Sequence, residues 1–254
     1  MKNGQKEEFL KLWKKHFDGA ELPVAFFYTE EETVPGPPAS AERCLIANLA
    51  RVRRGTPLRF GNDTIGCSGG RRYTGFSEAL RPDFEYFLSC GLPGKMEGER
   101  YKKSPELVRE IMAKGPRFRA PKPYIVFKRW DQLEARDEPD VVVFFAQPDV
   151  LAGLFTLASF DTAEPSGVVA PFGAGCGSIV LYPYLERDKP QPKGVIGLFD
   201  PSARPYVPAG TLTFAAPFTK FTAMVGNMEE SFLTTPTWNV IRKRIAAHPL
   251  RSNS

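Results

Sequence analysis

The sequence predicts an α/β (or α+β) fold, in which a mixed β-sheet is flanked by helices within one compact domain of residues 1–254. Phenylalanine- and valine-rich runs of strand length alternate along the chain with stretches whose apolar residues recur at helical spacing. The 22 glycines and 24 prolines separate these segments and indicate many loops. The 20 phenylalanines supply enough apolar surface for a core, which argues against a disordered chain.

The strands are expected where short apolar runs are bounded by turn residues. Residues 140–146 contain the sequence Asp-Val-Val-Val-Phe-Phe-Ala, which is apolar enough for a central strand covered on both faces. The expected strands cover residues 23–28, 58–60, 124–130, 140–146, 194–199 and 211–215.

The helices are expected where apolar residues fall three or four positions apart. Phe9, Trp13 and Phe17 share one face of a first helix, which ends at Gly19. Ser104 is a suitable N-cap for another helix, because proline occupies the following position and an acidic residue comes next. The expected helices cover residues 7–17, 41–54, 83–90, 104–114, 148–159, 179–185, 218–228 and 237–247.

Residues 65–76 form a segment dense in groups that bind ligands. Its glycines allow another group to approach the backbone closely, and its adjacent arginines carry planar donors suited to carboxylate or phosphate. We expect this segment to bind a small molecule. The candidate binding residues here are Cys67, Ser68, Gly69, Gly70, Arg71 and Arg72.

A second glycine-rich loop spans residues 172–178, before a predicted helix, and adds Gly175, Cys176 and Gly177 to the candidates. It lacks the lysine of a phosphate-binding P-loop, so the alternative is a tight turn between closely packed backbones. Each half of the chain has a phenylalanine-rich strand, a helix and then a glycine-flanked cysteine. This order predicts an internal duplication, with halves 20–130 and 138–247, whose cysteine loops face each other.

The four cysteines allow metal or iron–sulfur ligation as a second hypothesis. Cys44, Cys67, Cys90 and Cys176 show no C-x-x-C spacing, so four thiolates would have to meet through the fold. Cys44 and Cys90 fall on predicted helices and are interpreted as small buried apolar residues. The sequence leaves the cofactor unknown, and an iron–sulfur cluster is one candidate.

Nucleophilic catalysis has weaker support. Residues 66–70 match the G-x-S-x-G pattern, but a nucleophile elbow needs a helix directly afterwards, and residues 71–76 are expected to be extended. The chain has two histidines, His16 and His248, and neither is near the candidate loops in sequence. A cysteine nucleophile would need Arg71 or a loop N–H to lower its pKa.

Charge and hydropathy limit the partners that we expect. The net charge of +5 comes from scattered basic clusters rather than one basic stretch, so we expect no nucleic-acid binding. No apolar run reaches the length of a membrane span, and the N-terminus is polar, which favours a cytoplasmic protein with no membrane partner. Four cysteines are too few for a disulfide scaffold of this size, in keeping with a reducing compartment. The oligomeric state is not determined by these patterns.

The order of these features resembles the uncharacterised ArCR family, a domain of unknown function numbered 169. The resemblance is carried by residues 44–47 on a helix that ends at residues 54–55, by residues 67–70 with 75–76, and by the loop of Cys176. Residues 201–204 resemble an arginine-bearing segment of that family. The resemblance spans residues 24–244 and implies a single compact domain, but it supplies no activity.

Together these observations favour a protein that binds a small anionic molecule or cofactor between its two halves. The reaction, if any, stays unknown. Two alternatives remain: a redox or iron–sulfur protein that uses the loop cysteines, and a non-catalytic interaction protein with purely structural loops. The full set of candidate ligand-binding residues is Cys67, Ser68, Gly69, Gly70, Arg71, Arg72, Gly175, Cys176, Gly177 and Arg204.

Overall fold

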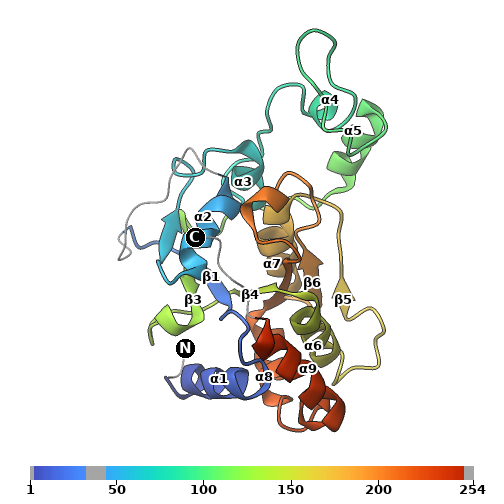
Figure 1. Ribbon diagram of the computed structural model, residues 1–254. Helices are drawn as coiled ribbons and strands as arrows, with labels where there is room; N and C mark the ends of the chain where they lie inside the picture. Colours follow the sequence, from blue (N-terminus) through green and yellow to red (C-terminus); the bar gives the residue numbers. More distant parts are fainter. Residues whose placement is uncertain (1–2, 33–43, 249–254) are drawn as a thin grey trace.

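The computed structural model describes residues 3–32 and 44–248, and it confirms the mixed α/β fold (Figure 1). Within these residues, seven strands form one sheet in the order β2-β3-β1-β4-β7-β6-β5. Neighbouring strands are antiparallel except for β5 and β6, which run parallel. The strands are β1 (Val24–Thr29), β2 (Leu58–Phe60), β3 (Tyr124–Arg129), β4 (Val141–Ala146), β5 (Val168–Val169), β6 (Gly194–Gly197) and β7 (Leu212–Pro217).

The central position predicted for residues 140–146 is confirmed, because β4 lies between β1 and β7 and is buried along its whole length. The other expected strands also form, with ends that differ by at most two residues. Strand β5 was not predicted. It contains two residues, Val168 and Val169, and is too short to show an alternating pattern.

Four helices cover one face of the sheet (Figure 1). They are α1 (Asn3–His16), α6 (Pro148–Ala158), α8 (Phe218–Gly226) and α9 (Pro236–Ala247). Their apolar sides pack around Phe144 of β4, and the rings of Trp13 and Phe17 stack with centroids 4.4 Å apart. This face is therefore a closed core, as the helical spacing of the first helix predicts.

The opposite face carries both cysteine loops. It is covered by α2 (Leu45–Arg53), by a wide helical turn η2 (Gly177–Leu181) and by α7 (Tyr182–Glu186). The short helix α3 (Ser68–Tyr73) packs beside η2. The first residues of the helix expected at 41–54 lie outside the described residues, and α2 begins at Leu45.

A long excursion between α3 and β3 projects from the domain and carries α4 (Phe84–Phe87) and α5 (Pro105–Lys114), as Figure 1 shows. We call residues 77–116 the arm. The helix expected at 83–90 shrinks to the single turn α4, because the chain turns at Gly91 with φ +76°. The predicted N-cap is confirmed, since Ser104 Oγ accepts the Leu107 N–H over 3.4 Å.

One observation supports the predicted duplication, and another argues against it. In each half the last long strand, β3 or β7, lies between the first strand and the preceding one. However, α2 and α6, which follow the first strands, lie on opposite faces of the sheet. A twofold axis between the antiparallel strands β1 and β4 would be perpendicular to the sheet and would place both helices on the same face. The duplication therefore stays a prediction.

Candidate functional site

A cavity of about 1300 Å³ opens where α3, the loop before η2 and the arm come together. Much of its wall is aromatic or aliphatic, and Met96 and Met112 belong to it. Cavities of this kind hold small organic molecules in many proteins. The aromatic residues on its wall are Tyr73, Phe84, Phe87, Tyr101, Phe172, Tyr182, Phe199 and Tyr206.

The two predicted loops meet at this cavity. Seven of the ten candidate residues line it: Cys67, Ser68, Gly69, Gly70, Arg72, Gly175 and Cys176.

The remaining three candidates lie off the wall. The guanidinium of Arg204 donates to the Thr211 carbonyl, and Gly177 packs against the ring of Tyr73. Arg71 and Arg72 are separated because residues 68–73 are helical, and successive helical side chains point about 100° apart. Arg72 therefore lines the cavity and Arg71 does not.

The extended conformation expected for residues 71–76 is wrong for its first half. Helix α3 runs from Ser68 to Tyr73, and the Arg71 N–H donates to the Cys67 carbonyl over 3.1 Å. At the end of α3 the Thr74 hydroxyl donates to the Gly70 carbonyl over 2.7 Å, which closes the turn. The sequence did not predict this helix because two glycines weaken helix propensity.

Gly70 brings its backbone close to the Cys67 thiol. Its N–H donates to Cys67 Sγ over 3.2 Å. A Cβ atom at position 70 would lie 2.8 Å from that sulfur and 2.7 Å from the Ile65 Cγ2 atom, which is too close for either. The glycine is therefore required by this close approach, as the sequence predicted for the segment.

Cys44 also belongs to the site, although the sequence interpretation treated it as a small buried apolar residue. It is the N-cap residue of α2, is only partly buried, and lines the same cavity as Cys67. The thiols of Cys44 and Cys67 interact, and each is the largest cause of the shift in the other's pKa. Cys90 differs from the prediction too, because it is exposed, follows α4 in a turn and lies off the cavity wall.

The three thiols at the cavity differ in pKa because their surroundings differ. The hydrogen bond from Cys44, and then N–H groups of Gly70 and Leu45, lower the pKa of Cys67 to about 6 against the effect of burial. The same bond to Cys67, together with burial, raises the pKa of Cys44. Burial raises the pKa of Cys176. At neutral pH the arrangement therefore favours one thiolate, Cys67, beside two protonated thiols.

The loop of Cys176 is held by a carboxylate that the sequence analysis did not select. Asp200 accepts the Gly175 N–H with one oxygen, and with the other it accepts the Ala203 N–H over 2.8 Å. The sequence Asp-Pro-Ser at 200–202 is a turn signal, and an aspartate at the start of a turn accepts local N–H groups. That signal identifies Asp200 as a turn residue but does not connect it with Gly175.

None of the candidate residues lies in the arm, although residues of the arm line the cavity. Tyr101 of the arm and Ser202, beside Asp200, both line the cavity. The Lys102 ammonium lies 3.8 Å from the centre of the Phe172 ring, in the loop before Cys176. The arm therefore contacts the second cysteine loop from above the cavity.

The described residues offer neither a cluster of metal ligands nor a histidine on the cavity wall. In residues 3–32 and 44–248 no group of three or more His, Cys, Asp or Glu side chains is placed to hold a metal ion. The iron–sulfur alternative thus finds no ready ligand set in that part of the chain. His16 lies in α1, on the other face of the sheet, where it is hydrogen-bonded to Glu229 over 2.9 Å.

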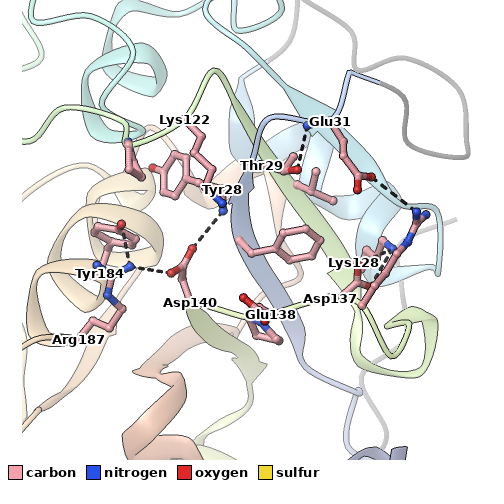
Figure 2. A pocket seen from close by; sticks show the side chains of 15 residues that line it. Tyr28, Thr29, Glu31, Lys122, Lys128, Asp137, Glu138, Asp140, Tyr184 and Arg187 are labelled. Atoms are coloured by element: carbon pink, nitrogen blue, oxygen red, sulfur yellow. Dashed lines mark hydrogen bonds and ion pairs between the residues drawn. The ribbon is translucent and has the colours of Figure 1, made fainter. Parts of the chain in front are cut away.

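A second cavity, of about 480 Å³, lies at the start of β4 (Figure 2). Its central carboxylate, Asp140, points between the backbone N–H of Tyr28, at 3.1 Å, and Arg187, at 2.7 Å. Arg187 also donates to the Tyr184 hydroxyl over 2.8 Å. Burial raises the pKa of Asp140, against these hydrogen bonds. Since its central groups satisfy each other, this cavity is best explained as a structural charge network.

The fold and the cavity define an α/β protein with a thiol-lined pocket on one face of its sheet. The chain belongs to the family described as uncharacterised ArCR, domain of unknown function 169, whose family model matches residues 14–227. This match confirms the resemblance carried by the cysteine segments. Comparison with curated proteins and with solved structures gives no significant match. Among the described helices, none combines the length and apolar character needed to cross a membrane.

Proposed function

We propose that the protein binds a small organic molecule in the 1300 Å³ cavity, against Cys67 and the loop of Cys176. The observation that carries this proposal is the convergence of two glycine-cysteine loops, more than 100 residues apart in sequence, on one large cavity. A purely structural role for these loops would not explain the volume of the cavity or its aromatic wall. Whether the bound molecule reacts is a separate question.

The wall indicates the chemistry of the ligand. Its aromatic and methionine side chains favour an apolar or aromatic body. Arg72 on α3 is the cation beside the cysteine segment, and one of its N–H groups donates to the Glu78 carbonyl over 2.8 Å. Its planar guanidinium suits an acidic group on the ligand. The expected ligand is therefore an aromatic or aliphatic molecule that carries an acidic group.

Anilinonaphthalene sulfonate is a suitable probe, because it joins an aromatic body to a single anionic group. Gly69 offers a way to fill the cavity without strain, since it lines the wall and a Cβ atom there would meet nothing within 4 Å. The matched control is Gly226 at the end of α8, which is equally open and lies off the cavity.

Wild-type protein and Gly226→Leu should bind the probe saturably with the same Kd, measured by its fluorescence. Gly69→Leu should weaken binding at least about tenfold, which corresponds to about 1.4 kcal/mol. Near-ultraviolet circular dichroism checks that both variants are folded. Equal affinity in all three proteins would contradict the proposal.

We also infer that the protein works in the reducing environment of the cytoplasm and does not bind nucleic acid. All four cysteines are free, as a reducing compartment favours. Several basic side chains are paired with carboxylates, such as Arg53 with Glu21 and Arg244 with Asp149. Paired charges are poor anchors for a phosphate backbone.

A further inference from the structure

Two thiols from different elements contact each other on the wall of the cavity. Cys44 begins α2 and Cys67 begins α3, and both line the cavity. A Cβ atom at Gly70 would lie 2.8 Å from Cys67 Sγ and 3.7 Å from Leu45 Cβ, which places Cys67 beside the start of α2. Each thiol is the largest cause of the shift in the other's pKa. Both are partly exposed, and neither is in a disulfide. Many proteins bury a single cysteine as a small apolar residue, but two thiols in contact at a ligand cavity are a reactive arrangement.

We propose that Cys44 and Cys67 form a redox-active dithiol, which reduces the disulfide bond of a small organic molecule bound in the cavity. Cys67 attacks, and Cys44 resolves the intermediate. This inference rests on the proposed function to the extent that the substrate must enter the same cavity. It adds a reaction and a substrate class, organic disulfides, to the binding role.

The environments of the two sulfurs suit these different roles. A nucleophilic thiol should be ionised near neutral pH, and the pKa of Cys67 is lowered to about 6. The resolving thiol should stay protonated until the mixed disulfide has formed, and the pKa of Cys44 is raised. Once the Cys67 sulfur is bonded, it no longer holds a negative charge, and the hydrogen bond that kept Cys44 protonated is lost.

The reaction balances without a metal or a further cofactor. The Cys67 thiolate attacks one sulfur of R–S–S–R′, forms a Cys67–S–S–R bond and releases R′S⁻. The Cys44 thiol gives its proton to R′S⁻, attacks Cys67 Sγ and releases RS⁻, which takes a proton from solvent. Two protein thiols are oxidised to one disulfide while the substrate disulfide is reduced to two thiols. An excess of a small thiol reverses both steps.

Cys176 is the third thiol near this pair and the competing partner. It lies near enough for ionisation of Cys176 to oppose that of Cys44 and for ionised Cys67 to raise the pKa of Cys176, but its side chain is buried, with 7% of its surface exposed. A sulfur so enclosed is poorly placed to attack a mixed disulfide at the cavity surface. The pairing Cys44–Cys67 is therefore the specific prediction.

Equilibration of the reduced full-length protein with mixtures of reduced and oxidised glutathione tests the pairing. The four cysteines fall in separate tryptic peptides, so mass spectrometry after acid quenching and alkylation identifies every disulfide. We expect the peptides of Cys44 and Cys67 to become cross-linked as oxidised glutathione increases. Exposed Cys90 should form only a glutathione adduct, which gives an internal control.

Variants separate the two roles. Cys44→Ser should leave Cys67 trapped as its glutathione adduct, raising that adduct at least about tenfold over wild type. Cys67→Ser should prevent glutathione from forming any disulfide at Cys44, and Cys90→Ser should leave the Cys44–Cys67 pairing unchanged.

A stable Cys67–glutathione adduct in the wild type, a disulfide to Cys176, or no oxidation of the pair would overturn the proposal. Because this readout does not use the fluorescent probe, it can fail while the cavity still binds. Conversely, the pair can oxidise in a protein whose cavity rejects the probe, which would leave the dithiol intact and remove the proposed ligand class.

Discussion

The side chain of Ser178 joins the cysteine loop to the end of strand β6 through Leu198. Its hydroxyl accepts the Leu198 N–H over 3.2 Å and donates to the Gly175 carbonyl over 2.9 Å. Leu198 has φ +69°, a left-handed conformation that is strained for a leucine. A Cβ atom on neighbouring Gly197 would lie 1.9 Å from the Ser178 hydroxyl. This junction fixes the position of Cys176 against the sheet.

Replacement of Ser178 by alanine should destabilise the protein, because the buried Leu198 N–H would lose its acceptor. We expect a loss of about 1–3 kcal/mol in the free energy of unfolding, measured with urea. Thr156→Ala removes a hydroxyl from the exposed side of α6 and should cost less than about 0.5 kcal/mol. Equal effects of the two substitutions would show that the junction is not a stabilising contact.

The pKa of Cys67 can be tested by its reactivity. The rate of its alkylation by iodoacetamide should rise with pH around a midpoint near 6, because only the thiolate reacts. Cys44→Ala removes the largest cause of the lowered pKa, so the midpoint should move upward, toward ordinary thiol values.

Cys90 provides a reference in the same sample, since it is exposed and does not line the cavity. Peptide mass spectrometry follows both cysteines at each pH. The thiolate is more stable in the folded chain than in the unfolded chain. This contribution to stability is therefore present at alkaline pH and is lost as pH falls through 6. A Cys67 midpoint equal to that of Cys90 would contradict the assigned environment.

A buried ion pair on β3 should matter more for stability than the ion pairs at the surface. Lys128 and Asp137 are almost fully buried, and their charged groups lie 2.8 Å apart. Asp137→Ala leaves the ammonium without its nearest carboxylate and should cost about 3–5 kcal/mol in urea unfolding.

Two comparisons sharpen this prediction. Glu110→Ala, which breaks an exposed pair with Lys114 on α5, should leave stability almost unchanged. The double variant Lys128→Met, Asp137→Leu should recover part of the loss, because no charge then remains buried at the pair. A double variant less stable than Asp137→Ala alone would refute this account of the pair.

The contact between the arm and the second loop should control access to the cavity. Phe172→Ala removes the ring beneath the Lys102 ammonium. We expect probe binding to weaken and alkylation of Cys67 to accelerate, each by about two- to fivefold, the size of one such contact. Phe155→Ala on α6 removes a similarly exposed ring from the other face and should change neither rate nor affinity. A null result for Phe172→Ala would show that the arm does not restrict entry.

Most elements of the sheet and its helices could be predicted because hydrophobic periodicity is a local signal. The apolar run of β4 and the spacing of Phe9, Trp13 and Phe17 each depend on neighbouring residues alone. Helix α3 could not be predicted in this way, because two of its six residues are glycines. Because α3 was not predicted, the different directions of the Arg71 and Arg72 side chains were not predicted either.

The candidate site was predicted only as far as its loops. Glycines beside Cys67 and Cys176 marked both segments, but the contact of Cys67 with Cys44 joins helix ends 23 positions apart. No local spacing rule links such positions. No residue of the arm was a candidate, because the contribution of the arm to the cavity wall depends on how it folds back over the loop of Phe172.

The methionine methyl groups offer the most direct test of small-molecule binding in this cavity. Met96 and Met112 line it, whereas Met224 and Met228 are buried on the opposite face of the sheet. Protein labelled at its methionine methyls should be titrated with anilinonaphthalene sulfonate and followed by nuclear magnetic resonance. We predict saturable shifts of the Met96 and Met112 signals, with Met224 and Met228 unchanged. Shifts confined to Met224 and Met228, or no saturable shift of Met96 and Met112, would contradict the account.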